Sequence, residues 1–311
     1  MSRLVRILVL SLSLVCASCG GVSLPAPAQQ SAYPLRSYFP DPKAQALALA
    51  AEHGNVEEVR RLMKEKHVDP DVIFSKDGYP LLMWPILTQN PEGLRAMLEN
   101  GADPNARKLH PQQNTTRFKG RYEDNAMIWA AKQEDSIYLK LLLDHGGDPN
   151  ARNSNGETLL LQAFLTQNKW ENVKLLVERG ADVNATSQGS PIIFHYAARG
   201  GFEQVFWLLE HGADPKINDL TRNPDGSHEY PVVADVFWHP GNPNDPTWQR
   251  KCQQWLLQRG HTRPPLPDYL QKMRKAFGFP SEEKDIPLLG SSRITVGAIE
   301  HFRVARAGSW R

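Results

Sequence analysis

Two of the three cysteines in this 311-residue sequence are separated by only two residues, as Cys16 and Cys19. A Cys-x-x-Cys pair suits a redox disulfide when a strand precedes it and a helix follows it, and it supplies half of a zinc site when a second pair exists. Here Gly20, Gly21 and a stretch of Pro, Ala and Gln follow the pair, and the remaining cysteine is the lone Cys252. The spacing therefore favours neither redox nor zinc chemistry.

Other groups that could do chemistry lack partners at a useful spacing. His228 and His239 lie in a turn-rich stretch without a second short-spaced pair, so we interpret them as loop histidines. Cys252 lies in a helical pattern and is interpreted as a small buried residue. The sequence contains no Gly-x-Ser-x-Gly elbow, no His-Glu-x-x-His motif and no phosphate-binding loop. We therefore expect no catalytic residue, no metal, no cofactor and no small-molecule substrate.

The first residues have the organisation of an export signal. Two arginines precede an apolar run over residues 7–15, which is too short to cross a bilayer. Small residues then lead to Cys19, an arrangement that resembles the bacterial lipobox, although Cys16 stands where that motif usually has Leu. We predict a signal peptide over residues 1–18 and lipidation of Cys19. An ordinary cleaved signal peptide is the alternative.

The composition beyond the signal limits the class of protein. Residues 19–42 are rich in Pro, Ala, Gln and Ser, which cannot bury a core, so a flexible tether is predicted there. The formal net charge of the chain is only +2, which argues against a nucleic-acid partner. With Cys252 as the one cysteine beyond the signal, an apolar core has to hold the fold without disulfides.

A short phrase recurs through the middle of the chain. Its clearest copy is Gly-Ala-Asp-Pro-Asn-Ala from Gly101, and the copies place aspartates at positions 69, 103, 148, 182 and 214. Before each later copy, apolar residues recur at three- and four-residue steps, for example over 170–179 and 202–211, which indicates a helix with one buried face. The glycine that follows such a helix suits a left-handed C-cap.

A shorter helical pattern precedes each of these helices. Residues 194–198 (Phe-His-Tyr-Ala-Ala) resemble part of the ankyrin signature T-P-L-H-x-A-A, and 127–131 match it with Ile in place of His. The chain thus resembles the ankyrin-repeat family, whose period is about 33 residues. The resemblance implies an all-α ankyrin-repeat solenoid over 43–260, with about five to six helix pairs, and backbone hydrogen bonding by His195. Pro85 should shorten the first turn of one inner helix.

Two insertions and a tail depart from this pattern. The insertion at 107–123 is basic and favours an acidic partner surface, whereas the insertion at 218–248 is rich in turn signals and aromatic residues. Residues 251–260 have the pattern of a last outer helix. We interpret residues 261–311 as a C-terminal capping extension with a helix over 269–277.

The resemblance implies that hairpin tips and inner-helix ends bind a protein partner. Exposed Tyr and Arg side chains among them are expected to be the main anchors. The candidate partner-binding residues are Lys76, Tyr79, Thr88, Arg107, Arg121, Tyr122, Lys132, Gln133, Arg152, Ser154, Glu157, Thr166, Gln188 and Arg199.

Ankyrin repeats that follow an export signal resemble Gram-negative periplasmic ankyrin lipoproteins. Some of those resemble immunity proteins that neutralise lipase toxins of the type VI secretion system. The resemblance implies a protein that is not an enzyme, that is lipid-anchored in the periplasm, and that inhibits a phospholipase toxin. A general envelope scaffold with an endogenous partner is the alternative, and an enzyme within the tail is a third hypothesis.

Overall fold

The computed structural model describes residues 34–108, 123–217, 221–222, 228–242 and 245–288. The predicted signal peptide, Cys19, Arg121 and Tyr122 lie outside these residues. No helix in the described part of the chain is long and apolar enough to cross a bilayer.

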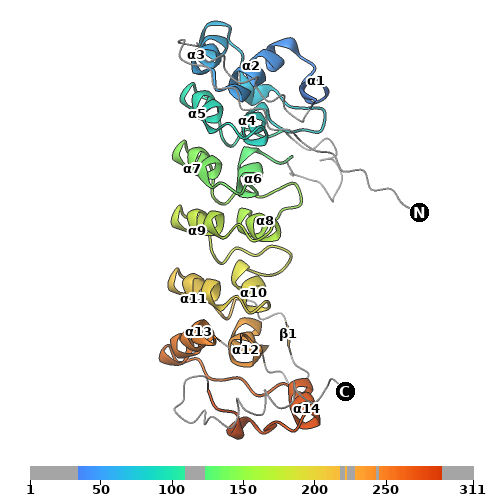
Figure 1. The fold of residues 1–311 in the computed structure, drawn as a ribbon, viewed down its shortest axis with the longest axis vertical. Coiled ribbons are helices and arrows are strands. Elements are labelled where there is room, and N and C mark those ends of the chain that lie inside the picture. Colours follow the sequence, from blue (N-terminus) through green and yellow to red (C-terminus); the bar gives the residue numbers. More distant parts are fainter. Residues whose placement is uncertain (1–33, 109–122, 218–220, 223–227, 243–244, 289–311) are drawn as a thin grey trace, which may run out of the picture. The chain divides into compact units, whose positions relative to one another are not determined.

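Six helix pairs follow one another in the described residues, with the inner helices in one column and the outer helices in a second column (Figure 1). The inner helices are α2 (Pro42–Glu52), α4 (Trp84–Leu87), α6 (Ala126–Ala131), α8 (Leu159–Leu165), α10 (Ile192–Ala197) and α12 (Pro231–Trp238). The outer helices are α3 (Val56–Arg60), α5 (Pro91–Glu99), α7 (Ile137–Asp144), α9 (Trp170–Glu178), α11 (Phe202–Glu210) and α13 (Thr247–Gln258). A π-helical turn, η1 (Arg61–Glu65), continues α3, and short 3₁₀ turns, η2 (Pro70–Val72) and η3 (Leu81–Met83), lie on either side of the next hairpin.

The recurring glycines end the outer helices as predicted. Their φ angles are positive, from 78° at Gly260 to 100° at Gly101, a region that side-chain-bearing residues rarely adopt. Pro85 also acts as predicted, since the inner helix of the second pair begins as the 3₁₀ turn η3 and its α-helical part is only four residues long.

The folded region begins earlier than predicted. A short helix, α1 (Leu35–Tyr38), precedes Phe39, which is 1% exposed. The rings of Tyr38 and Phe39 lie 5.9 and 6.2 Å from that of Trp84, so this segment packs on the second repeat. The tether predicted over 19–42 is therefore wrong at its C-terminal end, because Phe39 is buried and Tyr38 is half-buried against Trp84.

The predicted insertion at 218–248 is also too long. It holds a small antiparallel pair of strands, β1 (Thr221–Arg222) and β2 (His228–Glu229), followed directly by α12. Val232 and Val236 of α12 are at most 1% exposed, and α12 packs against α13 as the inner helix of the sixth pair. The fold is thus mostly helical, with one minor departure from all-α. The helix was not predicted because turn-forming residues precede and follow it in the sequence.

The tail packs against the last repeat. The indole Nε1 of Trp238 donates to the backbone C=O of Pro264 at 3.2 Å, and the Arg263 guanidinium lies 4.1 Å from the centre of the Trp238 ring. Arg263 also donates to the C=O of Ile286 at 2.7 Å. A helix follows where one was predicted, α14 (Asp268–Ala276), and then a 3₁₀ turn, η4 (Glu283–Asp285).

Candidate partner-binding face

The hairpin tips are joined to one another by asparagine side chains. Asn105, Asn150 and Asn184 occupy the same place in successive copies of the repeated phrase. The Oδ1 atom of each accepts the backbone N–H of the next repeat's aspartate at 2.7–2.8 Å. The Nδ2 atom donates to the C=O of the next repeat's glycine at 2.9–3.1 Å. We call these residues the asparagine ladder; it fixes each hairpin relative to the next.

Two predicted anchors, Arg107 and Arg152, continue this linkage. Arg107 donates to the backbone C=O groups of Glu123, at 3.1 Å, and of Arg152. Arg152 in turn donates to the C=O of Gly156 at 2.8 Å and to that of Thr186 at 3.0 Å. Both guanidinium groups therefore stabilise the hairpin row itself.

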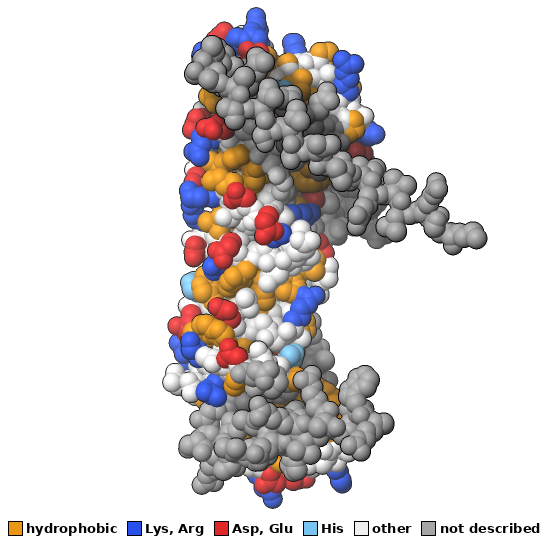
Figure 2. Space-filling view, viewed as in Figure 1, with side chains coloured by type: hydrophobic (Ala, Val, Ile, Leu, Met, Phe, Trp, Pro, Cys, Tyr) orange, Lys and Arg blue, Asp and Glu red, His pale blue; other side chains and the backbone are white. Residues whose placement is uncertain are grey.

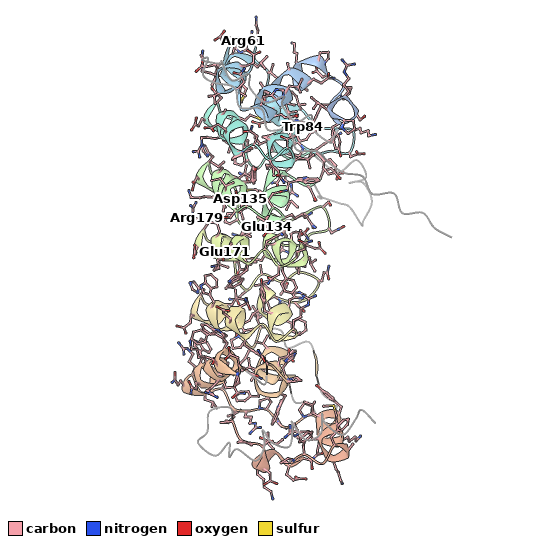
Figure 3. All side chains as sticks on the ribbon, viewed as in Figure 1. Arg61, Trp84, Glu134, Asp135, Glu171 and Arg179 are labelled. Carbon is pink, nitrogen blue, oxygen red and sulfur yellow. The ribbon has the colours of Figure 1, made fainter. Side chains whose placement is uncertain are left out.

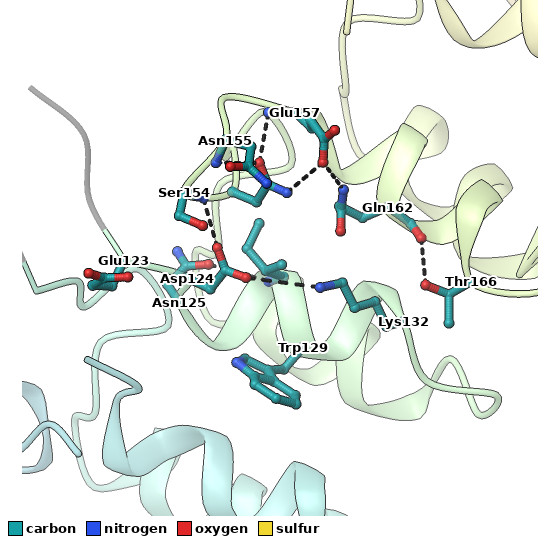
Figure 4. Close-up of polar contacts among 12 residues, drawn as sticks. Glu123, Asp124, Asn125, Trp129, Lys132, Ser154, Asn155, Glu157, Gln162 and Thr166 are labelled. Atoms are coloured by element: carbon teal, nitrogen blue, oxygen red, sulfur yellow. Dashed lines mark hydrogen bonds and ion pairs between the residues drawn. The ribbon is translucent and has the colours of Figure 1, made fainter. Parts of the chain in front are cut away.

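Glu157 is the centre of a polar cluster (Figure 4). Its Oε2 accepts hydrogen bonds from Asn153 Nδ2 at 2.7 Å and from Gln162 Nε2 at 2.6 Å. Its Oε1 accepts from Nε2 of Gln188 in the following hairpin. The predicted contacts Glu157 and Gln188 are thus brought together, but they bond to each other.

Asp124 holds two further candidates in the same cluster (Figure 4). Its Oδ1 accepts the backbone N–H of Ser154 at 2.7 Å, and its Oδ2 lies 3.9 Å from Lys132 Nζ. Lys132 also lies 5.9 Å from the centre of the Trp129 ring. Asp124 and Trp129 were missed from the sequence. Trp129 could have been found in the sequence, because it occupies the unspecified position, x, of the signature copy at 127–131.

An aromatic pair borders this cluster. The rings of Tyr79 and Trp129 meet edge to face, with centroids 5.2 Å apart. Burial raises the pKa of Tyr79, and the negative charges of Asp124 and Asp77 add to this effect. The Nε1 of Trp129 is buried and has no hydrogen-bond partner among the described residues. The pair therefore offers an apolar edge beside the carboxylates of Asp77 and Asp124.

The inner-helix ends differ in what they can offer a partner. The hydroxyls of Thr88 and Thr166 each donate to a backbone C=O four residues earlier, at 2.9 Å, and Gln133 donates to the C=O of Trp129 at 3.3 Å. In contrast, Arg199 is exposed and its guanidinium lies 4.3 Å from the centre of the Phe164 ring. Lys76 is exposed and makes no hydrogen bond or ion pair with the described residues.

His195 does not make the backbone hydrogen bond predicted from its place in the signature. Its Nε2 is buried without a partner among the described residues, and its ring lies 5.5 Å from that of Phe164. Burial, and then the nearby Arg199, lower the pKa of His195, so the imidazole is neutral near pH 7. The role is packing, because Phe164 and Phe194 surround the ring.

Charged residues also join neighbouring repeats at the helix ends. Lys169 pairs with Glu134 of the preceding repeat, and Arg179 pairs with Asp144 at 2.7 Å. Figure 3 labels Glu134 and Arg179, which lie at the level of the third and fourth helix pairs. Acidic and basic side chains are interspersed over the face shown in Figure 2. Among the described residues, no group of three or more His, Cys, Asp and Glu side chains lies close enough to hold a metal ion.

Helix pairs stack on one another, hairpins connect them, and hydrogen bonds join neighbouring hairpins. This architecture defines the class of repeat proteins that bind other proteins through a preformed surface. The chain belongs to the ankyrin-repeat family: the family model described as "Ankyrin repeats (3 copies)" matches residues 31–108 and 127–219.

The chain is also similar to solved ankyrin structures. The ankyrin repeat domain of Bcl-3, a member of the IkappaB family, is 25% identical, with a TM-score of 0.49, and the match covers 70% of this chain and 86% of that one. EF0377, an ankyrin repeat protein, is 20% identical, with a TM-score of 0.48 and coverage of 69% and 98%. No curated protein sequence matches the chain.

Proposed function

We propose that this protein is a periplasmic immunity protein that binds and inhibits a phospholipase toxin of the type VI secretion system. Cys19 carries the lipid that holds it to a membrane. The membership of the ankyrin family supports a protein partner, and such repeat arrays are generally interaction scaffolds without catalysis. The toxin, the lipid anchor and the periplasm rest on the export-type N-terminus and on the resemblance to periplasmic ankyrin lipoproteins.

The observation that carries the proposal is the rigidity of the hairpin face. Asn105, Asn150 and Asn184 fix successive hairpins, and Arg107, Arg152 and Glu157 add bonds across the same hairpins. A surface that is already ordered loses little conformational entropy on binding, which favours tight occlusion of an active site. Tyr79, Trp129 and Arg199 provide partly exposed aromatic and cationic groups on that surface, the residue types that dominate binding energy.

Periplasmic co-expression with a phospholipase toxin encoded beside this gene tests the proposal. We expect the full chain to protect the cell and to form a complex with the toxin. Tyr79→Ala and Arg199→Ala should each weaken that complex by about tenfold or more. Gln254→Ala, at an exposed position on α13, is the matched control and should bind as the unmodified chain does. Absence of both protection and complex would contradict the proposal.

Two further results separate the parts of the proposal. Cys19→Ala should move the protein from the membrane fraction to the soluble fraction when the membranes are washed at high salt, which weakens purely electrostatic contacts. A variant that stays with the washed membranes would show that the lipid anchor is wrong. Capture of an endogenous envelope protein, with no protection against the toxin, would favour a general envelope scaffold instead.

A further inference from the structure

The helix α14 presents an apolar stripe that no described part of the chain covers. Tyr269 and Met273 of α14 and Phe277, its C-cap residue, follow one another at four-residue steps, which places them on one side of the helix. They are 69%, 46% and 73% exposed, and no residue of α14 is buried. Large exposed apolar side chains occur elsewhere among the described residues, but this is the place where three of them share one helical face.

Cations border this stripe. Lys272, three residues after Tyr269, is exposed on one side of the stripe, and Arg274, three residues before Phe277, lies half-buried on the other side with its Nε donating to the C=O of Pro280 at 2.6 Å. The acid of α14 itself, Asp268, stands in the first turn of the helix, where it complements the helix dipole. Further acids follow in and beside η4, beyond the turn at Gly278. The helix is thus amphipathic, with an apolar face between basic side chains.

We propose that α14 lies on an anionic phospholipid surface, with Tyr269, Met273 and Phe277 at the level of the headgroups and Lys272 against lipid phosphate. Charge complementarity selects this occupant, since lysines at the edge of an apolar helical face bind anionic lipid while their aliphatic stems lie along the apolar boundary. Tyrosine suits this place because its ring is apolar and its hydroxyl reaches water.

The expected binding is weak and reversible because the apolar face is only about two turns long. Stable membrane association generally takes two signals. A lipid on Cys19, as in the proposed function, would be one such signal and α14 the second. The contact of α14 with lipid does not itself require that anchor.

Co-sedimentation with vesicles tests the inference. The chain from residue 20 onward lacks Cys19 but keeps every described residue, so any binding is independent of the lipid anchor. We expect it to sediment with vesicles of equal phosphatidylcholine and phosphatidylglycerol, but not with phosphatidylcholine alone, and less strongly at high salt. The double variant Tyr269→Ser with Phe277→Ser should bind at least about tenfold more weakly. Lys272→Glu should weaken binding similarly.

Val72→Ser is the matched control, because Val72 is 70% exposed in η2 of an early repeat and its loss should leave vesicle binding unchanged. Unchanged circular dichroism and melting temperature show that each variant is folded. Equal binding to both vesicle types, or undiminished binding of the double serine variant, overturns the inference. The double serine variant is also made in the full chain, which keeps Cys19. If this variant binds vesicles more weakly but still protects against the toxin, the stripe contacts lipid and the immunity function does not depend on α14. If it loses toxin binding but keeps vesicle binding, the stripe is a protein contact and the inference is wrong.

Discussion

The Oδ1 atom of Asp71 accepts a hydrogen bond from the backbone N–H of Asp103 in the next repeat, at 2.9 Å. Asp71 stands where the later repeats have Asn105, Asn150 and Asn184. A carboxylate can replace the accepting Oδ1 of asparagine, but when ionised it cannot donate as Nδ2 does. The ladder is therefore incomplete at its first step.

We expect Asp71→Asn to stabilise the protein at pH 7 by about 1–2 kcal/mol. Burial, and to a lesser extent the carboxylates of Asp69 and Asp103, raises the pKa of Asp71 to about 6, against the opposing effect of the Asp103 N–H. The ionised form is thus disfavoured in the folded state, and water near this half-buried side chain weakens the effect. Urea denaturation at pH 7 measures the gain.

The sign of the pH dependence follows from the raised pKa. The folded state binds the Asp71 proton more tightly than the unfolded state, so this group stabilises the protein below about pH 4 and loses that contribution as the pH rises to about 6. The advantage of Asp71→Asn should therefore shrink toward pH 4. Asp77→Asn, at an exposed hairpin position, is the control and should change stability little at either pH. A pH-independent effect of Asp71→Asn would contradict this account.

Removing a complete step of the ladder should have the opposite effect. Asn150→Ala removes the bond to the Asp182 N–H and the bond to the Gly180 C=O. The two bonds are solvent-exposed, so we expect a loss of about 1–2 kcal/mol in the free energy of unfolding. Asn155→Ala, at an exposed position outside the ladder, should cost far less in the same titration. Equal losses for the two variants would show that the ladder adds no stability.

The thiol of Cys252 should be unreactive in the folded protein. It is fully buried, its Sγ donates to the C=O of Phe202 at 3.3 Å, and burial raises its pKa to about 12. In the chain from residue 20 onward, where Cys252 is the one thiol, a disulfide reagent at pH 8 should label it only after unfolding. Gln254→Cys should add a thiol that labels in the native state. Rapid native labelling of Cys252 would contradict its burial.

Arg263 should control how firmly the tail is held. Arg263→Ala removes the contact with Trp238 and the bond to Ile286, so trypsin should cleave at Lys272 and Lys275 about tenfold faster. Arg259→Ala is the matched control, because its guanidinium also lies over an indole, 3.8 Å from the centre of Trp255, but makes no hydrogen bond with the described part of the tail, which ends at residue 288. The two variants should melt at similar temperatures. Unchanged cleavage in Arg263→Ala would mean that other contacts hold the tail.

Much of the fold was predictable because its signals are local. Gly101, Gly146, Gly180 and Gly212 mark helix ends by a backbone conformation that glycine adopts readily, and the aspartate two residues on accepts a nearby backbone N–H. The helix α12 escaped prediction because it lacks this phrase and lies between turn signals. The segment 34–39 escaped because its burial depends on Trp84, far along the chain.

The candidate site was harder to predict. Lys76 and Arg199 are exposed as expected. Arg107, Arg152 and Glu157 bond to groups 31–45 residues away in neighbouring hairpins, so no local pattern could show that these side chains are partly engaged.

The sequence by itself determined the repeat, its period and the helix ends, because each depends on the conformational preferences of a few consecutive residues. Only the tertiary structure decided which polar side chains face a partner and which hold the array together. A hydrogen bond or ion pair between repeats depends on the distance between groups that the chain separates widely, and stacking alone sets that distance.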